Sequence, residues 1–93
     1  MNFEIRYHDA VVREDIPGLS MFMKKRIKNA LENKLMKDPV HFGKPLRRSL
    51  KNYRKLRVGD HRVIFRIENQ VVKIFIIQHR SVVYDHAQQR TEG

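Results

Sequence analysis

Apolar residues recur at every second position at the start of the chain. This period of two, over residues 2–7, is typical of a strand with one buried face. A short helical segment is expected at residues 9–15, because Asp9 is suited to cap a helix and apolar residues follow it. The chain is therefore predicted to begin with a strand and a helical turn.

A helical period governs the longer segment from Pro17 to Lys37. Its apolar residues recur mostly at spacings of three and four and form one stripe. The stripe comprises Leu19, Phe22, Met23, Ile27, Ala30, Leu31 and Leu35. Pro17 suits a first helical turn and Pro39 disfavours helical backbone at Asp38, so we predict a helix over residues 17–37.

The pattern changes to strands in the second half of the chain. Three runs rich in Val, Ile, Phe and Tyr cover residues 53–58, 62–67 and 71–79. The segments between them, residues 59–61 and 68–70, are short enough for hairpins, so the runs predict a β-meander. The last run is interrupted by a single charge, Lys73, before Ile77, which is typical of a central strand.

The remaining segments complete the predicted fold. Residues 40–51 show no clean period and are expected to form a basic connecting loop, and the polar residues 88–93 are expected to fray. A chain of 93 residues has room for one domain, here residues 1–93. We predict an α+β fold of order β-α-α-β-β-β, with an antiparallel-dominated sheet of about four strands and helices packed on one face.

The net charge is large for a domain of this size. Twenty Lys and Arg against ten Asp and Glu give +10, an excess typical of nucleic-acid-binding proteins. Nine basic residues and one acidic residue lie between Lys44 and Arg66, so the charge is also concentrated along the chain. Solubility alone is the alternative explanation, although acidic residues serve solubility equally well.

Several classes of protein are disfavoured by composition. The chain contains no cysteine, so no disulfide or cysteine-ligated zinc site is expected. It lacks an apolar run that would suit a signal peptide or a bilayer span, so we expect a cytoplasmic protein without membrane contact. Its histidines lack metal-binding spacing, so no metal or other cofactor is expected. They are His8, His41, His61, His79 and His86.

Two basic residues of the first meander strand share a face. Lys55 and Arg57 point to the same side as Tyr53, because side chains alternate along a strand. Arg62 begins the partner strand across a short hairpin, so it can lie within reach of both. Three adjacent cations repel one another, which favours an anion-binding site. Charges that protect a sheet edge from aggregation are the alternative.

Further polar side chains follow the last strand. His79, Arg80 and Tyr84 are expected to converge with these cations at one end of the sheet. A single arginine is usually a surface charge and a single tyrosine usually packs its ring, so only the group indicates a site.

The residues that carry these features resemble a known family. The run YRKLRVGDHRVIF at residues 53–65, followed by HRSVVY at residues 79–84, resembles the C-terminal signature of the RelE/ParE toxin superfamily. The resemblance implies a toxin of a bacterial or archaeal type II toxin-antitoxin system that is neutralised by an acidic antitoxin. RelE-type members cleave mRNA on the ribosome, whereas ParE-type members share the fold and poison DNA gyrase.

The polar positions favour the RelE branch. The five positions at which RelE-type toxins are similar fall on Lys55, Arg57, Arg62, Arg80 and Tyr84. Arg57 stands where the best-known RelE pattern has lysine, and no glutamate lies in this basic stretch to act as a base. The resemblance implies an endoribonuclease that needs no metal. It would bind the ribosome through its rRNA, cleave mRNA there and inhibit translation.

The expected reaction is attack of an RNA 2′-hydroxyl on the neighbouring phosphate. Arg62 and Arg80 are expected to stabilise the transition-state charge, with Arg57 also neutralising phosphate and Tyr84 orienting the nucleotide. A lysine among cations loses its proton more readily, so Lys55 is the first candidate for the general base and His79 the second.

Additional RNA contacts are expected outside this cluster, from Arg47, Arg48, Lys51 and Arg54. Two other functions stay open. One is a ParE-like gyrase inhibitor without RNA cleavage, and the other is a basic module that binds RNA or DNA without cutting it.

Overall fold

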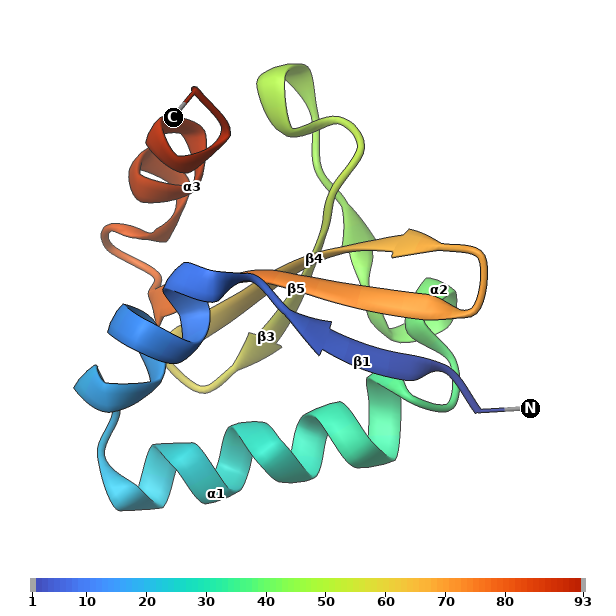
Figure 1. Cartoon of the computed structure of the whole chain (residues 1–93), viewed down its shortest axis with the longest axis horizontal. Helices are drawn as coiled ribbons and strands as arrows, with labels where there is room; N and C mark the ends of the chain where they lie inside the picture. Colours follow the sequence, from blue (N-terminus) through green and yellow to red (C-terminus); the bar gives the residue numbers. More distant parts are fainter. Residues whose placement is uncertain (1, 93) are drawn as a thin grey trace.

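The computed structural model describes residues 2–92 and contains one open five-stranded sheet (Figure 1). Its strands are β1 (Glu4–Tyr7), β2 (Lys44–Pro45), β3 (Arg54–Val58), β4 (His61–Glu68) and β5 (Val71–His79). The strand order is β1-β5-β4-β3-β2, with β1 parallel to β5 and the other neighbours antiparallel. The predicted antiparallel-dominated sheet is confirmed, and the short β2 extends it at one edge.

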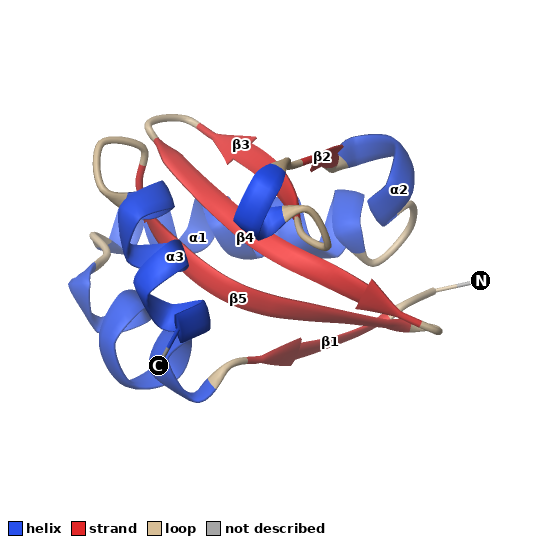
Figure 2. Cartoon of the chain, turned by 90° about the horizontal axis from the view of Figure 1, so that it is seen from above, coloured by secondary structure: helices blue, strands red, loops and turns tan. Residues whose placement is uncertain are grey.

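Helical segments cover both faces of the sheet. They are η1 (Val11–Asp15), η2 (Ile16–Gly18), α1 (Met21–Ala30), η3 (Leu31–Leu35), α2 (Pro39–Phe42), η4 (Arg48–Leu50) and α3 (Val83–Glu92). The continuous helix α1–η3 lies along one face and α3 on the other (Figure 1 and Figure 2). Within residues 2–92, no helix is long and apolar enough to cross a bilayer.

The main hydrophobic core lies between α1–η3 and the sheet. Ile27 and Leu35 of the helix pack with Leu56 and Val63 of the strands, and all four are almost fully buried. Val11 of η1 joins the same cluster, so both predicted helical segments pack on one face. The predicted α+β class is thereby confirmed.

A second, smaller core lies on the opposite face, beneath α3 and η4. Val83 and Ala87, four residues apart on α3, pack with Leu50 of η4 and with Ile64 and Ile76 of the sheet. Residues four apart lie on one side of a helix, so α3 covers this face with a single apolar edge.

A β-bulge in β5 decides which side chains reach each core. Ile74 and Ile76 pair with consecutive residues of β4, so Phe75 is the extra residue. Phe75 and Ile76 consequently both face the α3 side, and Ile77 returns to the α1 side. The bulge therefore inverts the alternation of every residue that follows it in β5.

The meander agrees with the predicted strand limits to within one residue. Both hairpins close through two-residue turns, and the first turn residue has positive φ, +58° at Gly59 and +56° at Asn69. Glycine and asparagine are the residues that adopt this backbone most readily, which explains both turns. As predicted, β5 is interior, with β1 and β4 on its two sides.

The predicted start of the main helix was wrong. Pro17 belongs to the separate turn η2, and α1 begins after Ser20, whose hydroxyl accepts the Met23 N–H at 3.1 Å. A serine cap satisfies a backbone donor that would otherwise lack a partner, so it outweighs the proline signal. Phe22, assigned to the apolar stripe, is 70% exposed, because it lies one position from the inward-facing Met23.

The predicted cap of the first helical turn also differs. Asp9 forms an exposed ion pair with Arg13, and the Ala10 N–H is accepted by Nδ1 of His8. The chain thus uses an imidazole nitrogen where a carboxylate was expected.

Two segments predicted to lack regular structure are partly ordered. Residues 40–51 contain most of α2, the edge strand β2 and the turn η4. Residues 88–92 belong to α3, whereas residue 93 lies outside the described residues. Their own sequence is polar, so the order comes from tertiary contacts of α3.

The strongest of these contacts is a buried ion pair. The carboxylate of Asp15, 1% exposed, accepts two bonds from the Arg90 guanidinium at 2.9 and 3.1 Å. It also accepts the Ile77 N–H and a side-chain N–H of Gln78. Burial raises the pKa of Asp15, but the hydrogen bonds from Arg90, Gln78 and Ile77 and the Arg90 charge lower it below its ordinary value.

We expect Asp15→Asn to destabilise the fold by about 3 kcal/mol at neutral pH, because it leaves Arg90 as a buried charge without its partner. Urea unfolding followed by circular dichroism measures the change. Because the pKa of Asp15 is lower in the folded state, ionised Asp15 stabilises the fold at pH values above the unfolded pKa of about 4. This stabilisation is lost as the pH falls through the folded pKa. The variant should lack this acid dependence.

The matched control is Asp9→Asn, which removes a carboxylate from an exposed pair in the same region. Exposed pairs contribute little, so the change should be below about 0.5 kcal/mol. Equal stabilities of the two variants would contradict the role given to Asp15.

Candidate active site

Three of the predicted site residues share a face of the sheet beside the β3–β4 hairpin. Arg57 pairs directly with Arg62, and Lys55 pairs with Ile64, which places Lys55 diagonally opposite Arg62. Lys55, Arg57 and Arg62 border one cavity of about 330 Å³. The predicted cluster of three cations is therefore present in the structure.

Two further cations that border this cavity, Lys34 and Lys44, were missed by the sequence analysis. Lys44 of β2 pairs with Lys55 across the sheet and borders the same cavity. Residues 40–51 were expected to form a loop, and only the formation of β2 brings Lys44 alongside β3. Lys44 lies between Gly43 and Pro45, and this local sequence does not predict a strand.

Arg62 is held by the hairpin that precedes it. Its Nη1 donates to the carbonyl oxygens of Gly59 and His61, at 3.0 and 2.8 Å. These bonds use one nitrogen of a five-donor group and fix the direction of the guanidinium. A guanidinium held in this way is suited to receive a phosphate oxygen without further ordering.

Tyr84 reaches the same region from α3. Its ring lies against Lys55, with Nζ 5.8 Å from the ring centroid, which is within the range of a cation–π contact. The ring also packs against the cluster formed by Val83 and Ile64. Tyr84 was expected just after the last strand, and the structure shows that it belongs to the first turn of α3.

Arg80 lies at the same end of the sheet. Its backbone N–H donates to the carbonyl of Asp60 at 2.8 Å, which ties the end of β5 to the β3–β4 turn. The residue is exposed. Arg80 therefore stands beside the hairpin that carries Arg62, with its side chain open to solvent.

His79 is separated from the cluster. It pairs with His61, and the two rings meet edge to face at 5.7 Å. Two residues earlier, Ile77 faces α1, so alternation places His79 on that side. Its Nδ1 lies 2.8 Å from Oγ of Ser81 and accepts the Ser81 N–H.

The paired His61 has a distinctive environment. Its Nδ1 is buried and has no hydrogen-bond partner among the described residues. Burial lowers the pKa of His61, the nearby His79 lowers it further, and Asp60 opposes the shift.

The predicted RNA-binding residues outside the cavity fall into two groups. Arg47, Arg48 and Lys51 are exposed around η4, which is anchored by buried Leu50. Arg54 instead lies on the face of Leu56, and its Nη1 donates to the Gly43 carbonyl at 3.0 Å and to that of Val40 at 3.4 Å. Arg54 thus supports the end of α2 rather than extending the loop cations.

Comparison with known proteins assigns this fold to a class. A family model described as the ParE toxin of the type II toxin-antitoxin system, parDE, matches residues 6–84. The RelBE2 toxin-antitoxin complex of Mycobacterium tuberculosis contains a chain with 27% identity and a TM-score of 0.79, over 86% of this chain and 100% of that one. No curated protein matches the sequence.

Two further solved structures share the fold. A mutant of Escherichia coli RelE in the free state has 18% identity and a TM-score of 0.72, over 97% of this chain and 98% of that one. The RelB–RelE complex of Methanococcus jannaschii has 19% identity and a TM-score of 0.68, over 87% and 96%. The fold is that of type II toxins. The chain belongs to the RelE/ParE superfamily of these toxins.

The histidine pair yields a prediction about titration. His79→Gln removes the neighbouring charge, so we expect it to raise the pKa of His61, which lies below its ordinary value in the wild type. NMR titration of the imidazole signals measures the shift. His86→Gln, on α3, is the control and should leave the His61 midpoint in place; an unmoved midpoint in His79→Gln would refute the coupling.

Proposed function

We propose that this toxin is a metal-independent endoribonuclease that cuts mRNA, in a ribosome-dependent manner, and so inhibits translation. The observation that carries the proposal is the cavity shared by Lys55, Arg57 and Arg62, with the ring of Tyr84 against Lys55. Several cations around one small cavity favour a phosphodiester as the ligand, and the resemblance to RelE-type toxins favours RNA.

The proposed reaction begins at the ribose. The 2′-oxygen attacks the adjacent phosphorus while the bond from phosphorus to the 5′-oxygen breaks, which leaves a 2′,3′-cyclic phosphate and a 5′-hydroxyl. Lys55 takes the 2′-hydroxyl proton as the general base, and the leaving 5′-oxygen gains a proton from water or from a protonated side chain of the site. No redox partner or metal is required for this balance.

Charge on the phosphorane-like transition state is neutralised by arginines. Arg62 is oriented by the hairpin carbonyls and Arg57 lies opposite it, while the exposed Arg80 follows β5 with its backbone bonded to the same hairpin. Donors fixed before the reaction stabilise developing charge without reorganisation. Tyr84 is placed to stack on or hydrogen-bond to the nucleotide beside Lys55. His79 lies on the other face, so Lys55 is the better-supported base.

The partners follow from the same proposal. mRNA and the ribosome with its rRNA are the targets, which implies a cytoplasmic site of action. The M. tuberculosis and M. jannaschii structures are toxin-antitoxin complexes, so we infer a cognate antitoxin for this chain as well. The net charge of +10 favours an acidic one.

One finding favours a second candidate function. The matching family model is described as a ParE toxin, and gyrase inhibition is the activity that the resemblance attaches to that branch. Cell-free translation and DNA supercoiling assays with the purified toxin separate the two activities. Inhibition of supercoiling without RNA cleavage would select the gyrase inhibitor.

We expect Arg62→Lys and Arg80→Ala each to lower mRNA cleavage by about 10²-fold, because each removes a donor to the transition-state charge. Primer extension on ribosome-bound mRNA measures cleavage, and circular dichroism verifies the fold. Lys25→Ala removes an exposed cation from α1, on the other face, and should cleave normally. Full cleavage by both arginine variants would remove the proposed site.

The exposed cations around η4 yield a separate prediction. Replacing Arg47, Arg48 and Lys51 together by Glu should weaken RNA binding and flatten its salt dependence, by about 0.7 in the logarithmic slope per lost phosphate contact. Filter binding over a range of salt concentrations measures both effects.

The control is the triple replacement of Lys24, Lys25 and Lys28 by Glu, which changes the charge equally on α1. If binding responds to net charge alone, the two triple variants will have the same slope, and the loop has no specific role.

A further inference from the structure

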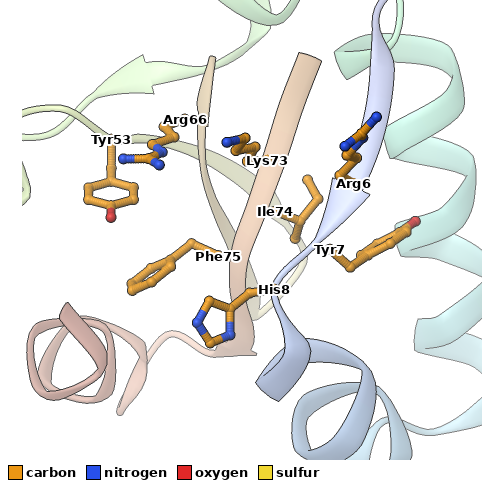
Figure 3. Close-up of a pocket in the computed structure, with 8 residues that line it drawn as sticks. All are labelled: Arg6, Tyr7, His8, Tyr53, Arg66, Lys73, Ile74 and Phe75. Atoms are coloured by element: carbon orange, nitrogen blue, oxygen red, sulfur yellow. The ribbon is translucent and has the colours of Figure 1, made fainter. Parts of the chain in front are cut away.

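A second group of cations crosses the α3 face of the sheet, away from the β3–β4 hairpin. Lys73 of β5 pairs with Arg6 of β1 on one side and with Arg66 of β4 on the other. Their strand neighbours Ile5, Ile67 and Ile74 pack on the α1 side, so the three cations share the opposite face. Figure 3 shows them side by side in one row.

Aromatic rings lie next to this row. Tyr53, just before β3, stands beside Arg66, and its ring meets that of Phe75 at 4.8 Å with an angle of 34° (Figure 3). The ring of His8 meets the edge of Phe75 at 5.4 Å. Phe75 lies two residues after Lys73 on β5, so regular alternation places its ring on the same face as the cations.

Cations and rings enclose one cavity of about 350 Å³. This volume lies at the lower end of the range for small-molecule sites and suits a single nucleotide. Two carboxylates at its margin hold the cations: Glu68 pairs with Lys73 at 2.7 Å and with Arg66 at 2.9 Å, and Glu4 pairs with Arg6. Three cations against two carboxylates leave a net positive charge.

The surroundings of Glu68 show how closely these groups interact. The hydrogen bond from Lys73 and the charges of Arg66 and Lys73 lower the pKa of Glu68. All these pairs are substantially exposed, so a ligand phosphate can replace a carboxylate as partner of the cations at little cost in burial.

We propose that this cavity binds an unpaired nucleotide of the RNA substrate, with its base against the Tyr53–Phe75 rings and its phosphate on the row Arg6–Lys73–Arg66. The inference rests on the proposed ribonuclease function and extends it, because no reacting group is assigned here. It defines a second subsite that holds the strand next to the scissile phosphodiester.

Two observations favour RNA over an acidic peptide. A peptide carboxylate would use the cations but would leave the aromatic faces without a matching surface, whereas a base stacks on them. Tyr53, just before β3, and Lys55 also lie on the same face, two residues and therefore about 7 Å apart along the chain. That separation is comparable with the step between neighbouring nucleotides in an extended strand.

The test measures binding of a fluorescein-labelled, single-stranded 2′-O-methyl RNA octamer, which lacks the attacking hydroxyl and stays intact. Fluorescence anisotropy is recorded over a range of salt concentrations. We expect Lys73→Gln and Arg66→Gln each to weaken binding several-fold and to lower the logarithmic salt slope by about 0.7. Lys25→Gln, the matched loss of one exposed charge on α1, should bind like the wild type.

A second pair of variants tests the stacking surface. Tyr53→Leu keeps an apolar side chain but removes the ring, and we expect about tenfold weaker binding, whereas Tyr53→Phe should bind normally. Tyr53 packs against the smaller core, so urea unfolding is measured for both. The exposed Lys73 variant tests the site independently of folding.

The outcomes separate this site from the proposed function. Binding by Lys73→Gln and Arg66→Gln equal to that of Lys25→Gln would overturn the subsite, even if the wild type cleaves mRNA. An oligo-glutamate peptide that is weakened by the same charge variants while Tyr53→Leu has no effect would overturn it in favour of a peptide site. Loss of RNA binding in the pocket variants of a protein that cleaves no mRNA would support the subsite and reject the ribonuclease.

Discussion

The ion pair between Asp15 and Arg90 fixes the relation between the sheet and α3. Asp15 stands at the end of η1, and its carboxylate also accepts the Ile77 N–H of β5, so three elements meet at one side chain. A buried pair adds little net stability over apolar residues, but an unpaired charge there is costly, which makes alternative positions of α3 unfavourable. Because α3 carries Tyr84, the position of that ring against Lys55 depends on a contact that α3 makes beside β5.

Local patterns in the sequence account for most of the fold. The alternation of β3 and β4, with Gly59 and Asn69 at the turns, is sufficient to predict the meander and its limits. By contrast, α3 has a polar sequence with only Val83 and Ala87 as its buried apolar edge. The order of α3 depends on the ion pair between Arg90 and Asp15, a contact that no local sequence pattern predicts.

The candidate site shows the same division. Alternation within β3 places Lys55 and Arg57 together, and the tight hairpin brings Arg62 to them, so this part follows from the sequence. His79 does not. Regular alternation from Lys73 would place it on the site face, but the extra residue Phe75 moves it to the α1 side. Nothing in a run of apolar residues marks where a bulge falls.

The parallel pairing of β1 with β5 bears on the order in which the chain folds. The meander requires only contacts between neighbouring segments, whereas β1 must pair with a strand near the other end of the sequence, and Asp15 must meet a partner 75 residues away. Distant contacts incur a larger loss of chain entropy before they form, which slows folding. The meander, with Lys55, Arg57 and Arg62 on one face, is therefore expected to form before the docking of α3 that fixes Tyr84.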